Sequence, residues 1–441
     1  MQCDKTLDAL EVRFRNLAQS TRSTPVGASK NGGLIASLDS RGGFRLQGRV
    51  AGLFRECLEL LLQVHPKEAH VHVLSRTQAD QILSRALLGV LHPRQPDDGS
   101  KAAFDERIAR EVAALRSQLT TAPRVWKVAH RVLGIRADSL PFTFGTVEFS
   151  SGEASASQIA KLVPTATRGV RPGREGLATE HKIRRKGRAE IRAAFRDNAV
   201  ATTAAQAMDS KAAVEIALER TRRAVDVINF FVPYFQEGLR AGPVLVAPAG
   251  KRIEASYAVW APGQAGVSWS RDWYPYDYPA VLTFNGSRAQ EVGFARAHEI
   301  AKAPTRNSLE DRILSALSWA GRATVEPRAD QSLMLYAIAL EGLLGNHKAR
   351  GGVTDRLRLR VVHLIGKTPQ ERRQLSGQFV DLYQLRSGVV HSGTALVSDT
   401  DLRMMSFFAE QALRAVLTEP EFIAMTCATI FQKVLDERAL G

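Results

Sequence analysis

The stretch DLYQLRSGVVHSG, from Asp381 to Gly393, organises the C-terminal part of this 441-residue chain. Four apolar residues in or just before it follow one another at steps of four, three and seven positions: Leu375, Phe379, Leu382 and Val389. Because an α-helix repeats every 3.6 residues, this spacing predicts the buried face of one helix. We therefore expect the segment to form a helix that packs on an apolar core.

Arg386 stands on the same stripe, at a position where the helical period favours an apolar residue. A guanidinium keeps its proton, so an arginine there needs an anion or a second chain. His391 follows about 140° further around the helix, and the long arginine side chain is expected to reach the same cleft. Ser387 and Gly388 are poor helix formers and predict a weak turn between the two.

Similar helical patterns continue through the last third of the chain. They predict helices over residues 308–322, 330–344, 354–365, 369–390, 399–417 and 423–438. An arginine followed by four to six residues and then a histidine occurs six times in the chain, so this spacing alone is weak. Only Arg386 and His391 combine it with an apolar stripe inside a fully patterned helical region, which we expect to be a bundle over residues 305–441.

Three segments of this region resemble an Apea-like HEPN domain, a helical bundle related to prokaryotic ribonuclease toxins and defence proteins. They are LMLYAIALEGLLG (Leu333–Gly345), VTDRLRLRVVHLIG (Val353–Gly366) and LYQLRSGVVHSG (Leu382–Gly393). The hexamer RSGVVH fits the Arg-x4-His motif of that family. The resemblance covers about the last third of the chain and implies a homodimer in which both motifs face a shared groove.

The chemistry of the two residues suits cleavage of RNA without a metal or cofactor. A histidine can take the proton of a ribose 2′-hydroxyl, and an arginine fork matches phosphate oxygens. We therefore expect His391 to act as acid and base and Arg386 to clamp the phosphate. Tyr383 and Ser387 would assist by hydrogen bonding. By resemblance, Glu341 stands where related domains carry an acidic residue and would orient the pair.

Other interpretations stay open. Arg386 could form an ion pair with Glu341 inside the bundle, and the bundle would then serve only in dimerisation or nucleic-acid binding. The sequence leaves undecided whether the site is an active endoribonuclease of phage defence or toxin-like growth arrest. A nucleotide-modifying activity of the N-terminal region is a third possibility, although the chain has no phosphate-binding loop, dinucleotide fingerprint or nucleophile elbow.

Composition describes an ordinary globular protein, with 44% hydrophobic and 24% charged residues. Three cysteines far apart in the sequence argue against a disulfide framework. The sequence has no long apolar run and no apolar signal core at its start, so we expect a cytoplasmic protein without a membrane span. His65, His70 and His72 lack the further ligands that a metal site needs, and we expect no metal there.

The formal net charge of +15 is unevenly distributed. Residues 305–441 hold 17 Lys or Arg against 15 Asp or Glu, whereas residues 161–196 hold 11 against 3. A local excess of this size favours a polyanion, although a solvated loop is the plainer explanation. The candidate nucleic-acid contacts in this basic segment are Lys182, Arg184, Arg185, Lys186 and Arg188.

The first 304 residues predict an α+β organisation. Residues 1–138 are expected to be mainly helical, with helices over 49–64, 77–91 and 102–119 and a shorter one over 126–133. Residues 139–304 mix predicted strands (142–151, 199–207, 243–247 and 254–260) with a helix over 210–231 that Ser210 would cap. Aromatic residues crowd together in 268–284, where they either stack nucleic-acid bases or pack on their own sheet.

Overall fold

A computed structural model of the chain describes residues 2–22, 37–38, 44–45, 48–65, 72–91, 100–136, 139–162, 189, 192–193, 195–196, 198–235, 244–246, 255–259, 268–272, 286–345, 353–392 and 396–440. These residues form two compact units. The first contains residues 1–128 and 204–219, and the second contains residues 129–203 and 220–441. Compactness does not reveal which parts fold independently, so the three predicted ranges stay a prediction.

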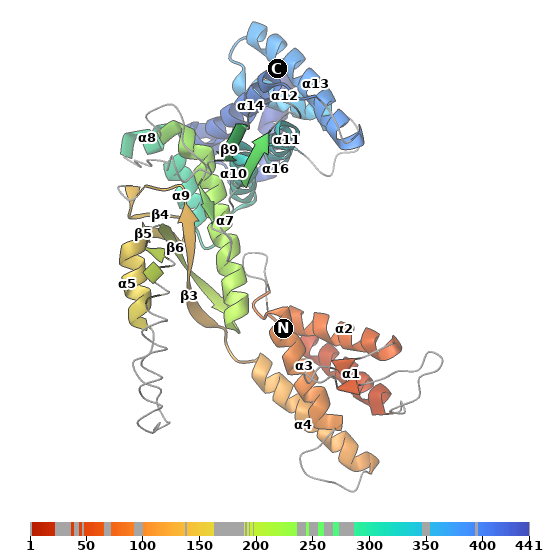
Figure 1. The fold of residues 1–441 in the computed structure, drawn as a ribbon. Coiled ribbons are helices and arrows are strands. Elements are labelled where there is room, and N and C mark those ends of the chain that lie inside the picture. The colour runs from red at the N-terminus through yellow and green to blue at the C-terminus, as the bar shows by residue number, and fades with distance from the viewer. Residues whose placement is uncertain are drawn as a thin grey trace. The chain divides into compact units, whose positions relative to one another are not determined.

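The fold class is α+β, as the sequence predicts (Figure 1). The helices before the C-terminal region are α1 (Gln2–Arg22), α2 (Gly48–Gln63), α3 (Arg76–Leu91), α4 (Lys101–Leu119), α5 (Gly152–Leu162), α7 (Ser210–Phe235), α8 (Gly286–Glu291) and α9 (Phe294–Lys302). The C-terminal helices are α10 (Ser308–Val325), α11 (Ala329–Leu344), α12 (Val353–Ile365), α13 (Pro369–Ser392), α14 (Asp399–Thr418), α15 (Pro420–Ile423) and α16 (Ala428–Leu440).

The strands are β1 (Ser37–Leu38), β2 (Phe44–Arg45), β3 (Arg124–Leu133), β4 (Phe142–Phe144), β5 (Val147–Ser151), β6 (Ala199–Ala207), β7 (Leu245–Val246), β8 (Ala255–Val259) and β9 (Ser268–Asp272). Five of them form a sheet in the order β4-β5-β6-β3-β7. Antiparallel ladders join β4 to β5, β5 to β6 and β3 to β7. The pairs β1–β2 and β8–β9 are separate two-stranded sheets.

Two local predictions in this sheet are wrong. Residues 126–133 belong to strand β3, not to a helix, because this segment pairs with its neighbours β6 and β7 in the sheet. Residues 142–151 form a hairpin instead of one strand. Gly145 makes the turn with φ +59°, and a Cβ there would come within 2.9 Å of the Cβ of Ala301.

In the first unit, helices α1–α4 bury a common apolar core. Its largest buried side chains include Phe14, Leu17, Leu61 and Leu83. The start of α7 is capped by Asp209 and not by Ser210 as predicted. One carboxylate oxygen of Asp209 accepts from the amides of Lys211 and Ala212, and the other accepts from the amide of Ser75. A carboxylate one position earlier thus satisfies first-turn donors that the serine does not reach.

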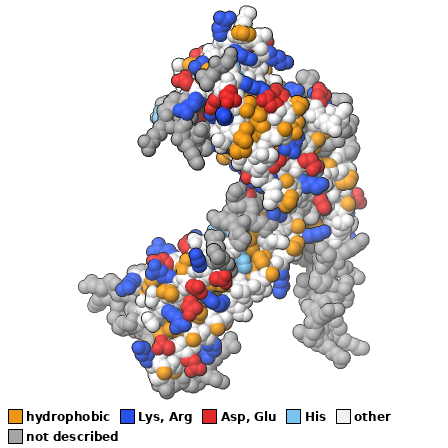
Figure 2. All heavy atoms as spheres, turned by 180° about the vertical axis from the view of Figure 1, so that it is seen from behind, with side chains coloured by type: hydrophobic (Ala, Val, Ile, Leu, Met, Phe, Trp, Pro, Cys, Tyr) orange, Lys and Arg blue, Asp and Glu red, His pale blue; other side chains and the backbone are white. Residues whose placement is uncertain are grey.

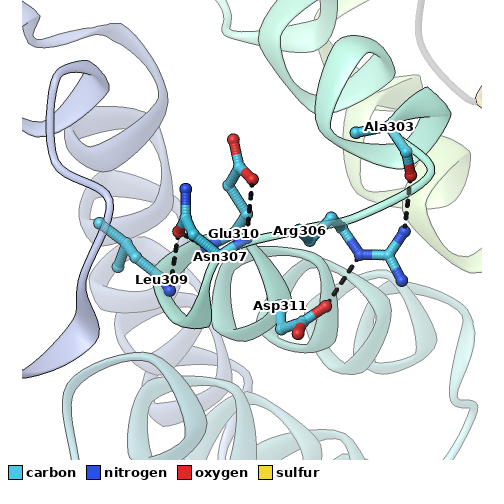
Figure 3. A network of polar contacts seen from close by, with 6 residues as sticks. All are labelled: Ala303, Arg306, Asn307, Leu309, Glu310 and Asp311. Carbon is cyan, nitrogen blue, oxygen red and sulfur yellow. Dashed lines mark hydrogen bonds and ion pairs between the residues drawn. The ribbon is translucent and has the colours of Figure 1, made fainter.

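In the second unit, an apolar core runs from the sheet residues Val132 and Phe149 through α7 and α9 into the C-terminal helices. Helix α10 begins with a capping box. Asn307 accepts from the amides of Leu309 and Glu310, and the Glu310 carboxylate accepts from the amide of Asn307. Figure 3 shows this turn together with Arg306, whose guanidinium donates to Asp311 and to the carbonyl of Ala303. The local sequence therefore fixes where the bundle starts.

Helices α7 and α10 pack unusually closely. Gly321 lies so near α7 that a Cβ on it would be 1.7 Å from the carbonyl oxygen of Asp226. The carboxylate of Asp226 accepts from the hydroxyl of Ser318 at 3.0 Å and from the Nε of Arg322 at 2.6 Å. A glycine is needed at position 321 because two helix backbones approach there without a side chain between them.

The bundle helices follow the predicted order, with one difference at the end. The helix expected over 423–438 begins only at Ala428, as α16, because the short helix α15 ends at Ile423 and a turn follows it. Arg360 on α12 is 2% exposed and holds α16 in place. Its guanidinium donates to both carboxylate oxygens of Asp436, at 2.6 and 2.7 Å, and to the carbonyl of Leu344 at the end of α11. Three helices are therefore joined by one buried cation.

Candidate functional site

Helix α13 carries the residues on which the sequence interpretation depends. Its predicted apolar stripe is confirmed at three of four positions, since Phe379 and Leu382 are 0% and 3% exposed and Leu375 packs against the core, whereas Val389 is only partly buried. The aromatic ring of Phe379 stacks on that of Tyr383, with centroids 4.5 Å apart. This packing fixes the rotation of α13 about its axis, and thereby decides which residues follow on the same face.

Arg386 lies on that face and meets Glu341 of helix α11. Its Nη2 is 3.0 Å from Oε1 and 3.3 Å from Oε2 of the carboxylate. The two side chains are 27% and 30% exposed, so the ion pair is neither on the open surface nor sealed inside the bundle. The Nε of Arg386 is buried and has no hydrogen-bond partner among the described residues. The guanidinium therefore retains donor capacity that the bundle does not use.

Tyr383 lies one helical turn before Arg386 and is 7% exposed. Burial raises the pKa of Tyr383 well above its usual range, the nearby Glu341 carboxylate raises it further, and the Arg386 guanidinium lowers it. The hydroxyl consequently stays protonated. It has no hydrogen-bond partner of standard geometry in the described part of the chain. Tyr383, Glu341 and Arg386 thus form one cluster, in which the carboxylate interacts with both the phenol and the guanidinium.

His391 lies five residues after Arg386, in the last turn of the same helix. Helix α13 continues without interruption to Ser392, so His391 leaves the helix axis about 140° around from Arg386 and roughly 7.5 Å further along. The imidazole is exposed, and within the described ranges it makes no hydrogen bond or ion pair. Ser387 is exposed as well. The imidazole is therefore available to solvent.

The predicted nucleic-acid contacts Lys182, Arg184, Arg185, Lys186 and Arg188 lie outside the described residues, as does most of the aromatic segment 268–284. On the face drawn in Figure 2, the basic and acidic side chains that are described are interspersed. The described residues contain no cluster of three or more His, Cys, Asp or Glu that could hold a metal. His72 instead donates through Nδ1 to the carbonyl of Leu62 at 2.8 Å, which is a structural contact.

A polar cavity between α10, α11 and α14 escaped the sequence interpretation. Its volume is about 340 Å³, and it is lined by Ala323, Thr324, Glu326, Ser332, Tyr336, Asp399, Leu402, Arg403, Ser406 and Glu410. The sequence does place polar residues on helix faces that the apolar pattern predicts to be buried, such as Ser406 and Glu410 one turn apart on α14. That signal says nothing about which other helix they face.

No family model matches the chain, and comparison with curated proteins and with solved structures gives no significant match. The described helices include none that is both long and apolar enough to cross a membrane.

Proposed function

We propose that the protein is a metal-independent endoribonuclease of the HEPN type that works as a homodimer through its C-terminal bundle. The proposal extends to a cytoplasmic role in phage defence or toxin-like growth arrest, which the sequence resemblance suggests. The supporting observation is the cluster on α11 and α13, in which Glu341 orients Arg386 while the arginine side chain stays 27% exposed and its guanidinium has more N–H donors than the carboxylate uses. Such donors suit a phosphate group.

In the proposed reaction the imidazole of His391 removes the proton from a ribose 2′-hydroxyl. The 2′-oxygen then attacks the adjacent phosphorus, and the bond from phosphorus to the 5′-oxygen breaks. The leaving 5′-oxygen receives a proton from a histidine, which yields a 2′,3′-cyclic phosphate and a 5′-hydroxyl. Arg386 stabilises the charge that builds on the phosphate oxygens, and Tyr383 donates a further hydrogen bond.

Helix geometry places His391 about 140° around α13 from Arg386 and roughly 7.5 Å further along, which leaves the imidazole free to act with the arginine of a second copy in the homodimer. Val390 beside His391 is 48% exposed and Leu396 is 98% exposed. These apolar side chains favour a contact between chains at the end of α13, where the two motifs would meet.

The proposal is tested with the purified full-length protein and single-stranded RNA in the presence of EDTA. Cleavage with 2′,3′-cyclic phosphate ends is expected, and His391→Ala should abolish it. Arg386→Lys should reduce cleavage by at least about tenfold, because lysine keeps the charge and loses the planar fork. Arg373→Ala is the control, since Arg373 is an exposed arginine on the same helix. Cleavage that survives His391→Ala at the full rate would refute the mechanism.

The ion pair itself favours a second candidate, a non-catalytic bundle used for dimerisation and nucleic-acid binding. An arginine that already has a carboxylate at 3.0 Å need not act on a substrate. The two candidates differ in one experiment. A binding module would retain an RNA oligonucleotide without cutting it, and His391→Ala would leave the affinity unchanged. An enzyme would convert the oligonucleotide in a reaction that depends on His391.

A further inference from the structure

The polar cavity between α10, α11 and α14 lies inside the second unit and contains none of the residues of the proposed ribonuclease site. It is bounded by the last turn of α10, the first two turns of α11 and the first three turns of α14. Its volume of about 340 Å³ is at the small end of the range of about 300–1,000 Å³ that ligand pockets occupy. We propose that this cavity binds a small aliphatic diamine.

The charges around the cavity favour a cation. Glu326, Asp399 and Glu410 contribute three carboxylates, and Arg403 contributes a single guanidinium. Within the described residues none of the three carboxylates forms an ion pair, whereas Glu341 and Asp436 elsewhere in the bundle each do. Arg403 in the lining and Arg328 beside Glu326 offset part of this charge, and the three carboxylates together still favour a cation.

The hydrogen bonds show that the cavity offers acceptors. Four hydroxyl groups line it, and one assignment of their hydrogens satisfies every bond. Ser332 donates to the carbonyl of Ala323 at 2.7 Å, and Thr324 donates to the carbonyl of Ala320 at 3.0 Å. Tyr336 then donates to Thr324 at 3.2 Å, because the hydrogen of Thr324 is already used.

The fourth hydroxyl, Ser406, donates to Oε1 of Glu410 at 2.5 Å. Oε2 of the same carboxylate accepts from Tyr234 at 3.1 Å. The cavity therefore presents lone pairs of hydroxyl and carboxylate oxygens, and the guanidinium of Arg403 is the charged donor in its lining. A ligand that brings several N–H donors complements this surface, while an anion or a ligand rich in acceptors does not.

The spacing of the carboxylates distinguishes an organic cation from a metal ion. In the described part of the chain no three acidic or His/Cys side chains come close enough together to hold a metal. Glu326 at the end of α10 and Glu410 in the third turn of α14 reach the cavity from different helices. Carboxylates placed apart suit a molecule with two ammonium groups joined by an apolar chain, and Ala323 and Leu402 offer that chain an apolar wall.

The test is isothermal titration calorimetry of the full-length protein with 1,4-diaminobutane at low salt. We expect binding of one molecule per chain, weakened at least about tenfold, or about 1.4 kcal/mol, by Glu410→Gln and by Asp399→Asn. Asp381→Asn is the matched control, because Asp381 is an exposed acidic residue on α13 outside the cavity. Asp399 is exposed at the first position of α14, so its variant tests the proposal even if Glu410→Gln disturbs folding.

Two related molecules complete the experiment. Butane-1,4-diol has the same chain without charge, and succinate carries the opposite charge, so neither should bind. The proposal is wrong if the diamine gives no heat at 10 mM, which is about ten times the weakest dissociation constant of interest, about 1 mM. It is also wrong if butane-1,4-diol or succinate binds as well as the diamine, or if both cavity variants bind the diamine as the parent protein does. RNA cleavage by the same variants separates this site from the proposed ribonuclease site, since neither substitution touches Arg386 or His391.

Discussion

Replacing Arg386 and Glu341 singly and together measures how strongly the two side chains depend on each other. Their atoms are 3.0 Å apart, and about 70% of each side chain is shielded from water. Exposed ion pairs contribute about 0.2–1 kcal/mol, and breaking a buried pair costs about 3–5 kcal/mol. For this intermediate exposure we expect a coupling energy of about 1–2 kcal/mol between Arg386→Met and Glu341→Gln.

Hydrogen exchange of the α11 and α13 amides as a function of urea is the appropriate assay. It reports the free energy of opening of these helices, whereas the melting of a chain with two compact units need not be a single transition. The coupling should weaken, without vanishing, as salt rises from about 0.05 to 0.5 M, because a partly buried pair is screened less than an exposed one.

Arg373→Met combined with Glu341→Gln provides the control cycle, because Arg373 is exposed on the same helix and has no contact with Glu341 among the described residues. Its coupling should be zero within error. A coupling below about 0.3 kcal/mol for Arg386 and Glu341 would mean that the pair does not persist in solution. Glu341 would then not position the arginine.

Three further predictions follow from buried groups. Asp436→Ala should lower the unfolding free energy by about 3–5 kcal/mol, because it leaves the buried Arg360 without its carboxylate. Arg360→Met should cost only about 1–2 kcal/mol, because Asp436 can then be solvated by water. Hydrogen exchange of α12 and α16 as a function of urea tests this order. Burial raises the pKa of Cys57 to about 12, whereas backbone N–H groups lower the pKa of Cys427. Iodoacetamide at pH 8 should therefore alkylate Cys427 at least about tenfold faster than Cys57, which peptide mapping would show. Burial and the Arg222 charge lower the pKa of His130 in the folded protein. The contribution of His130 to stability is therefore complete above about pH 6.5 and is lost as the pH falls through the lowered folded-state pKa. His130→Gln should reduce the loss of stability between about pH 7.5 and 5.5.

The helical periodicity was sufficient to predict the bundle and the buried face of α13. The stripe from Leu375 to Val389 is long, and every step fits the same period, so no other secondary structure explains it. The strand β3 could not be separated from a helix in the same way. Over residues 126–133 the apolar residues fit periods of 2 and 3.6 almost equally, and only the neighbouring strands decide between them.

Contacts between distant residues explain what the sequence could not predict. The pairing of Arg360 with Asp436 joins positions 76 residues apart, and no local pattern marks either residue as a partner of the other. The position of Glu341 beside Arg386 was expected from resemblance and not from spacing. Burial of the Tyr383 hydroxyl likewise depends on how α11 and α13 pack. The sequence suggested which residues to examine, and packing determined which of them meet.

The contact between Gly321 and Asp226 has a mechanical consequence. No side chain separates the two backbones, and two groups of α10 donate hydrogen bonds to the carboxylate of Asp226. Sliding or rotation of one helix against the other would therefore break polar bonds. The middle of α7 and the end of α10 therefore move together as one rigid body. A force applied to the exposed side of either helix would be transmitted directly to its neighbour.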